Sequence, residues 1–393
     1  MSAEADGPVP GGPVRLGTIA REWGRIGCIG FGGPPTHIAL LRKLCVERRR
    51  WIGATEFEDA IATMNLLPGP ASTQLAIFCA WRLRGTAGAL VGGLCFIVPG
   101  LVLILGLAAF FLSGDLPAWA GGAAAGAGAA VAAVAVQAGT ALLPASRQRA
   151  GAERAARARW IAYLIAGGAA AALIGPWLVS VLIAAGLAEI VVRGALPRRP
   201  GSAARAIPLA VGAPALGGLA AVGWVALKVG ALSYGGGFVI IPLMQSDAVD
   251  HHHWMSPAQF LNAVALGQIT PGPVVQTVAV VGYAAAGLFG GLFAAAVAFA
   301  PSFLFVIFGG RHFDRLRANV AVQAFLSGAG PAVIGAIIGS AIPLALALRH
   351  GWQFAVLAAA AIWLLAARRG VVSALLGAGG LGVLAALAGL PIG

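Results

Sequence analysis

Two Pro-Gly-Pro motifs interrupt apolar stretches of the sequence, one at residues 68–70 and one at residues 271–273. Proline lacks an amide hydrogen and clashes with the preceding turn, so each motif should break a helix. In a bilayer, such a break is tolerated only where the backbone lines a protein-enclosed or water-filled cavity. The half-helix that restarts after the break presents free N–H groups, which attract anions. Two such ends could hold one tetrahedral dianion between them, and a plain structural kink is the alternative.

Polar side chains flank both motifs at matched distances. Asn65 and Gln268 each lie three residues before a motif, and Thr73 and Gln276 each lie three residues after one. Amide and hydroxyl groups can hydrogen-bond the oxygens of an oxyanion, or they can satisfy carbonyl groups that a helix break exposes. Under the first alternative they form a candidate substrate-binding site with the motifs themselves: Pro68, Gly69, Pro70, Pro271, Gly272 and Pro273.

Paired glycines precede each motif, and we add Gly32, Gly33, Gly235 and Gly236 to the candidate site. No strand-like segment precedes them and no Gly-Lys-Ser or Gly-Lys-Thr follows, so the sequence excludes a nucleotide-binding loop. Glycine permits positive φ and a close approach of the backbone. Those properties suit either the wall of a substrate site or a tight helix crossing.

One basic residue precedes each glycine pair by seven positions: Arg25 in the first half and Lys228 in the second. A basic side chain at membrane depth costs roughly 2.5–3.5 kcal/mol on insertion scales, which makes it a candidate for function. We expect Arg25 and Lys228 to attract an anionic substrate. Snorkelling to the membrane interface is the alternative, and it suits Arg25 better because Arg15 and Arg21 precede it.

Carboxylates near the motifs are unequally distributed. Glu56 and Asp59 occur in the first half, where the second half has Gln259 and Asn262. A carboxylate shielded from water can carry a coupling proton, although acids at a helix start serve equally well as dipole partners. His37, which follows the first glycine pair, is a weaker candidate for a proton relay.

Metal and cofactor chemistry has little support in the sequence. The four cysteines show no metal-ligand spacing, and we interpret them as small buried apolar residues. Three adjacent histidines at residues 251–253 could bind a metal, but such a loop is more often solvated. We therefore expect no metal site and no cofactor.

The composition predicts a polytopic membrane protein of the all-α class. Of the 393 residues, 59% are hydrophobic and 10% are charged, whereas soluble domains carry about 25% charged residues. Apolar runs at 86–112, 118–143, 322–347 and 371–390 reach the roughly 18–20 residues that span a bilayer. The net charge of +13 comes from short clusters between these runs. Basic clusters of this kind are typical of the cytoplasmic loops between membrane spans, and they argue against nucleic-acid binding. The expected partner is the lipid bilayer.

An internal repeat divides the chain. At an offset of 203 residues Trp51 matches Trp254, Phe57 matches Phe260, and the two Pro-Gly-Pro motifs coincide. After one deletion the offset becomes 202, which pairs Gly85 with Gly287. We interpret residues 1–13 as a disordered tail, 14–200 as the first repeat and 207–393 as the second.

The charges also predict how the repeats insert. With the amino terminus in the cytoplasm and the motif segments re-entrant, all but two of the 26 Lys and Arg side chains lie inside. The repeats are then inverted, each with a discontinuous helix at its motif, and the carboxyl terminus lies outside. Inverted repeats with broken helices recur in secondary transporters and are unusual in membrane enzymes. We therefore expect a transporter and no enzyme.

The motifs also carry a family likeness. Gly30-Phe31-Gly32-Gly33-Pro34 and the run from Asn65 to Pro70 resemble the amino-terminal domain of the chromate ion transporter family. The run from Ser233 to Gly237 and the run from Gly267 to Pro273 resemble its second copy. The likeness covers nearly the whole chain and matches the long, two-domain form of the family.

The resemblance implies a secondary active transporter in the bacterial inner membrane that exports chromate from the cytoplasm and confers resistance to it. It further implies energy from the proton-motive force or from sulfate exchange. Sulfate is the close chemical relative of chromate, so a transporter of sulfate or another small anion is the alternative function. A homodimer is a further expectation.

Overall fold

The computed structural model describes residues 14–64, 69–114, 116–151, 153–174, 178–194, 218–233, 240–309 and 319–392. Every regular element in these ranges is a helix. Four helical stretches are long and apolar enough to cross a membrane: 71–111, 118–150, 274–309 and 320–346. The prediction of an all-α, polytopic membrane protein is therefore confirmed.

The helices follow the same order in the two halves of the chain. The first half contains α1 (Leu16–Ile29), α2 (Pro34–Arg42), α3 (Ala54–Met64), α4 (Ala71–Phe111), α5 (Ala118–Ala150), α6 (Arg154–Ala169) and α7 (Leu178–Val192). The second half contains α8 (Gly218–Leu232), α9 (Ile240–Gln245), α10 (Pro257–Ile269), α11 (Thr277–Gly309), α13 (Val320–Gly339), α14 (Ala341–Leu346), α15 (Gly351–Ala361) and α16 (Val371–Leu387). The predicted apolar runs lie in α4, α5, α13–α14 and α16.

Irregular backbone features recur at the offsets found in the sequence. A π-helical turn spans Lys43–Arg48 in the first half and Ser246–His251 in the second. Each long helix that follows a motif is kinked once, at Gly85 with φ 59° and at Gly287 with φ 61°. The same deviation at matched positions supports a duplication. The opposite insertion of the two halves and the re-entrance of the broken segments stay predictions.

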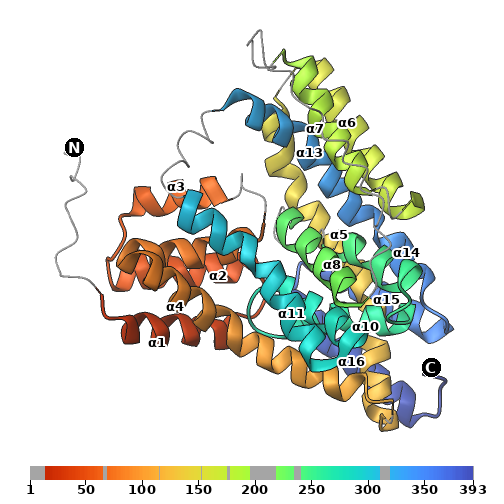
Figure 1. Ribbon diagram of the computed structural model, residues 1–393. Coiled ribbons are helices and arrows are strands. Elements are labelled where there is room, and N and C mark those ends of the chain that lie inside the picture. The colour runs from red at the N-terminus through yellow and green to blue at the C-terminus, as the bar shows by residue number, and fades with distance from the viewer. Residues whose placement is uncertain are drawn as a thin grey trace.

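The two halves exchange their outer helices. The pair α1–α4 packs like the pair α8–α11, and α4 contacts α11 at the centre of the molecule. Beyond this centre α5 packs against α15 and α16, whereas α13 packs against α6 and α7. In Figure 1, α1–α3 and the first part of α4 form a lobe on the left, and α5, α6, α7 and α13 rise together on the right. Each repeat is therefore completed by helices of the other.

Glycine allows these exchanged helices to approach closely. A Cβ atom on Gly126 of α5 would lie 2.2 Å from the carbonyl oxygen of Ala378 of α16. A Cβ atom on Gly167 of α6 would lie 1.8 Å from the carbonyl oxygen of Ala332 of α13. Both distances are shorter than van der Waals contact, so only glycine fits. Small residues at crossings are expected where lipid supplies no hydrophobic drive between helices.

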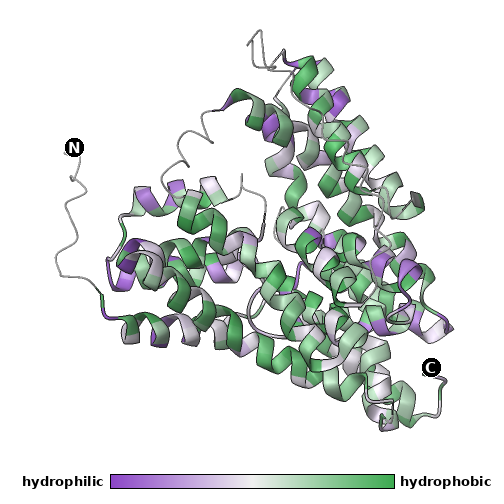
Figure 2. Ribbon diagram, in the orientation of Figure 1, coloured by the Kyte–Doolittle hydropathy of each residue, from purple (hydrophilic) through white to green (hydrophobic). Residues whose placement is uncertain are grey.

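The outer surface of the long helices is apolar. Val102 of α4 and Phe308 of α11 are 66% and 71% exposed. Figure 2 shows the long helices mostly in the hydrophobic colour, with hydrophilic residues gathered near helix ends and loops. Exposed apolar side chains along helices of this length fit contact with lipid.

Candidate functional site

Both Pro-Gly-Pro motifs coincide with interruptions between helices. At the first motif α3 ends at Met64 and α4 begins at Ala71, with Gly69 at φ 116° and Pro70 extended. Pro68 and Asn65 lie outside the described residues. At the second motif α10 ends at Ile269, Gly272 has φ 96°, and a single 3₁₀ turn precedes α11. We call these interruptions the first break and the second break.

A chain of three hydrogen bonds joins the two breaks. The ring nitrogen Nδ1 of His37 lies 3.3 Å from the Ser72 hydroxyl, just after the first break. The other ring nitrogen, Nε2, lies 2.9 Å from the carbonyl oxygen of Gly30. That same carbonyl accepts a hydrogen bond of 3.1 Å from the backbone N–H of Gly272, in the second break. His37 is fully buried, and Phe96 contacts its ring edge to face.

Close backbone approaches bring each break against the other repeat. A Cβ atom on Gly100 of α4 would lie 2.1 Å from the carbonyl oxygen of Pro271, in the second break. Gly33 has φ 74°, and a Cβ atom there would lie 3.7 Å from the side chain of Val274. A Cβ atom on Gly69 would lie 3.4 Å from the carbonyl oxygen of Gly230 in α8. Residues of both halves therefore form one site around the two breaks.

Buried polar atoms without a hydrogen-bond partner gather at these breaks. Within the described part of the chain they include the Thr73 hydroxyl, the Gln268 side-chain N–H₂ and the Gln276 side-chain oxygen, and the Ser302 hydroxyl in α11 is a further buried atom without a partner. The amide group of Gln276 is held in place, because its nitrogen donates to Thr270 and to the Pro271 carbonyl. An unpaired buried polar atom costs about 1–3 kcal/mol. Such a concentration indicates a site that a polar ligand or water completes.

The predicted cation Lys228 is already paired. Its ammonium group contacts Asp247, and the two side chains are 12% and 8% exposed. The ring of Trp224 lies 6.0 Å from the same nitrogen. Burial and the neighbouring His251 lower the pKa of His252, which disfavours a positive charge on this imidazole. Lys228 therefore adds little net charge to its surroundings in this structure.

The predicted cation Arg25 lies on the surface of α1. Its side chain is 51% exposed, with the nearest carboxylate oxygen, from Glu22, at 3.8 Å. Within the described residues no hydrogen bond or ion pair joins Arg25 to either break. Gly235 and Gly236, the second glycine pair, lie outside the described residues, whereas Gly32 and Gly33 both have positive φ.

The three proton-coupling candidates lie in different environments. His37 sits between the two breaks, as described above. Glu56 of α3 forms an ion pair with Arg82, and both side chains are more than one third exposed. Asp59 of α3 is exposed. Among the described residues, His37 contacts Ser72 beside the first break, and its role in coupling stays a prediction.

Four residues of interest lie outside the candidate site that the sequence predicts. Ser72 contacts His37, and Gly100 and Ser302 occupy matched positions in α4 and α11 at the 202-residue offset. The matched prolines just before them, Pro99 and Pro301, were the available signal. The fourth is Glu189 in apolar helix α7, a buried carboxylate that Arg159, Arg193 and Tyr163 hydrogen-bond. A lone acid in an apolar segment was its signal.

Comparison with known proteins covers nearly the whole chain. The family model described as "Chromate transporter" matches residues 17–190 and again residues 220–383. A chromate transport protein of Cupriavidus metallidurans is 32% identical over 82% of this chain and 80% of its own length. A chromate transport protein of Pseudomonas aeruginosa is 31% identical over 85% of this chain and 82% of its own length. No solved structure matches the chain.

Proposed function

The chain belongs to the chromate transporter family, and on that premise we propose that it is a secondary transporter that exports chromate across the bacterial inner membrane. Export would lower the cytoplasmic chromate concentration and so confer resistance. The amino terminus lies in the cytoplasm and the carboxyl terminus outside, with the two repeats inserted in opposite directions. Sulfate shares the charge and tetrahedral shape of chromate, and we infer that the same site accepts it with lower preference.

The observation that carries the proposal is the set of buried, unpaired polar atoms at the two breaks. A tetrahedral dianion accepts hydrogen bonds from several directions at once. The hydroxyls of Thr73 and Ser302 and the amide of Gln268 are donors without a partner in the described part of the chain. The first N–H groups of α4, at Ala71 and Ser72, have no acceptor within their own helix. These donors suit an oxyanion.

The charge around the breaks also favours an anion. The described residues that flank the breaks, 69–80 and 264–280, include no carboxylate that would repel one. The aligned peptide dipoles of α4 and α11 add partial positive charge at their amino-terminal ends. Dipoles and neutral donors can therefore hold a dianion without a permanent cation in direct contact.

The membrane potential supports the export direction. A potential of about 100 mV, negative inside, favours expelling a dianion by roughly 4.6 kcal/mol, which is twice the value for a single charge. Export can then proceed without a strongly coupled proton. Uptake against the same potential would require a coupling group, for which His37 is the best placed of the three candidates.

The test is chromate accumulation in a chromate-sensitive bacterial host with and without the protein. We expect lower intracellular chromate in cells that express it, and partial restoration of accumulation when excess sulfate competes. Reconstituted proteoliposomes should show charge movement when a chromate gradient is imposed. Equal accumulation with and without the protein would overturn the chromate proposal. Sulfate movement without chromate movement would identify the alternative, a transporter of sulfate or another small anion.

A further inference from the structure

A cationic pocket of about 210 Å³ lies between α1 and the turn that follows α2. We call it the basic pocket; its lining residues are Arg25, Ile26, Ile29, Leu40, Lys43, Leu44 and Arg48. Its volume is several times the roughly 30 Å³ that one water molecule occupies in the liquid. None of its lining residues belongs to either break, so the pocket is separate from the candidate transport site.

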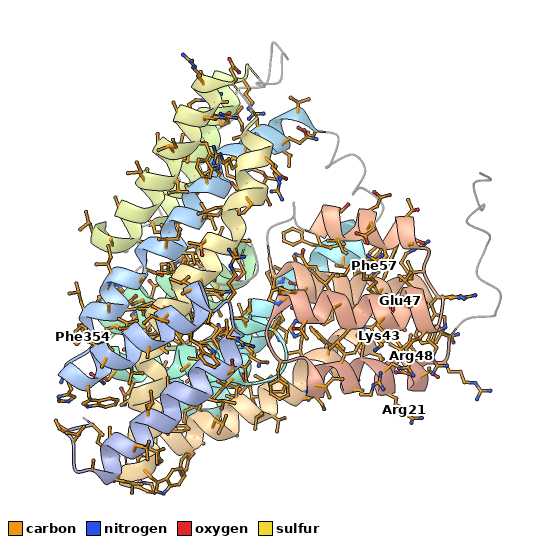
Figure 3. The ribbon with its side chains drawn as sticks, turned by 180° about the vertical axis from the view of Figure 1, so that it is seen from behind. Arg21, Lys43, Glu47, Arg48, Phe57 and Phe354 are labelled. Atoms are coloured by element: carbon orange, nitrogen blue, oxygen red, sulfur yellow. The ribbon has the colours of Figure 1, made fainter. Side chains whose placement is uncertain are left out.

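The charge of the basic pocket is poorly compensated. Among the described residues Arg25 pairs only with Glu22, at 3.8 Å, and Glu22 also pairs with Arg49 at 2.9 Å. Lys43 and Arg48 form no ion pair with any residue in the described ranges. Residues 21–50 carry seven Lys and Arg side chains against two carboxylates. Figure 3 shows Lys43 and Arg48 at the outer end of the lobe formed by α1–α4, with Arg21 close by.

The other side of the basic pocket is apolar. Ile26, Ile29, Leu40 and Leu44 supply that lining. Ile29 is 47% exposed, and the neighbouring Phe31 is 42% exposed. A pocket with cations on one side and exposed aliphatic side chains on the other resembles the boundary between headgroups and acyl chains of a bilayer.

The second repeat lacks an equivalent pocket charge, although its backbone follows the same course. At the 203-residue offset the residues Arg25, Lys43, Leu44 and Arg48 become Lys228, Ser246, Asp247 and His251. The position of apolar Leu44 therefore holds a carboxylate, which pairs with Lys228. In the second repeat the cation that matches Arg25, Lys228, is neutralised by Asp247. The positive charge of the basic pocket is therefore not a consequence of the fold that the two repeats share.

We propose that the basic pocket binds the phosphate group of an anionic phospholipid. The three cations contact the phosphate oxygens, and the acyl chains lie along Ile29 and Leu40. Basic pockets at the membrane boundary bind anionic headgroups, and each Lys or Arg contributes about 1 kcal/mol. Inorganic phosphate or sulfate shares the oxyanion chemistry, but neither would use the apolar side of the pocket.

The test is native mass spectrometry of the full-length protein in detergent, titrated with phosphatidylglycerol and, in parallel, with phosphatidylcholine of the same acyl chains. The pocket variant carries Arg25→Gln, Lys43→Gln and Arg48→Gln. The matched control carries Arg15→Gln, Arg21→Gln and Arg50→Gln, which removes the same charge from neighbouring exposed positions outside the pocket. A third arm adds millimolar inorganic phosphate to the unchanged protein.

We expect the unchanged protein to prefer phosphatidylglycerol, the pocket variant to lose at least about tenfold in that affinity, and the control to lose less than about threefold. About 1 kcal/mol per cation corresponds to a factor of about five for each. Equal losses in both triple variants, or no loss in either, would overturn the proposal. Displacement of the lipid by inorganic phosphate would identify a free-oxyanion site instead. Should the triple variant fail to fold, Lys43→Glu alone, at an exposed position, should also lower the affinity for phosphatidylglycerol.

Discussion

The turn after α2 and its counterpart after α9 have the same backbone, but the first is cationic and the second is neutralised by an ion pair. In the first repeat the turn at Lys43–Arg48 leaves Arg25 and its neighbours facing a pocket. In the second repeat Asp247, on the matched turn, pairs with Lys228. The backbone thus tolerates both arrangements, because the exchanged residues lie on a turn whose shape is set by main-chain hydrogen bonds. The two copies therefore share the shape of this turn and differ in the charge that it leaves available.

A similar difference separates the two breaks. Gly100 of α4 leaves room for Pro271 and Gln276, whereas the matched residue of α11 is Ser302, with a hydroxyl that has no partner among the described residues. After the breaks, Thr73 matches Gln276. Contacts within the protein therefore fill part of the second break, while the first break offers the Thr73 hydroxyl as a donor. A symmetric frame with asymmetric donors can bind one substrate molecule in a defined orientation.

The largest effect is expected from a variant that breaks the ion pair between Lys228 and Asp247 in the second repeat. Asp247→Asn leaves Lys228 without its carboxylate in a site where both side chains are nearly buried. Removing one partner of a buried pair costs about 3 kcal/mol, the lower end of the usual range. Thermal unfolding of the purified protein should show this loss.

The control replaces both partners: Lys228→Met with Asp247→Leu, the second being the residue that the first repeat carries at Leu44. This double variant should recover most of the stability, because no charge remains buried. A double variant as unstable as Asp247→Asn alone would show that the stability resides in packing rather than in the ion pair.

The next largest effect is expected from a variant that fills the space between Gly100 and the second break. Gly100→Ala places a methyl group 2.1 Å from the Pro271 carbonyl oxygen, so the second break must shift. Overpacking of this kind costs about 1–3 kcal/mol. We expect lower thermal stability together with loss of chromate transport in proteoliposomes. Gly106→Ala, in the same helix with no atom within 4 Å of the new methyl group, should change neither quantity. Normal transport by Gly100→Ala would show that the second break is not part of the transport site.

The positions of the breaks and of the long apolar helices followed from the sequence because they depend on local properties. Proline and glycine at residues 68–70 and 271–273 dictate interruptions whatever surrounds them, and the apolar runs dictate α4, α5, α13 and α16. The partners of the charged residues did not follow from the sequence. That Lys228 pairs with Asp247, and that Arg25 faces a pocket with Lys43, depends on the turn that brings distant positions together.

The position of His37 between the breaks was also beyond the sequence. Its residue type suggested a proton relay, but its contacts with Ser72 and Gly30 depend on the fold of α2 against α4. The exchange of α5–α7 with α13–α16 was equally hidden, since α13 begins at Val320, more than 120 residues after α7 ends at Val192.

The smallest effect is expected from a variant that tests whether the Thr73 hydroxyl, beside the first break, binds substrate. Thr73→Val replaces a buried hydroxyl that has no partner among the described residues with a methyl group of similar size. Removing an unpaired polar group should raise the free energy of unfolding by about 1 kcal/mol. If the hydroxyl binds substrate, chromate transport should fall about tenfold at the same time.

Thr277→Val is the matched control, because the Thr277 hydroxyl donates to the Val274 carbonyl at 2.8 Å. It should lower the stability rather than raise it. Comparing the two variants therefore distinguishes a hydroxyl that binds ligand from one that stabilises the fold. A Thr73→Val protein that is more stable and transports normally would remove Thr73 from the substrate site.

The exchange of helices between the halves also constrains how the chain is made. The face of α5 that carries Gly122 and Gly126 packs against Ala378 and Gly382 of α16. Ribosomes deliver α5 to the membrane more than 200 residues before α16 emerges. During that interval the glycine face of α5 must be shielded by lipid or by the insertion machinery. α16 therefore completes the packing of α5 long after α5 has entered the membrane, so the joining of these two helices is a late step of assembly.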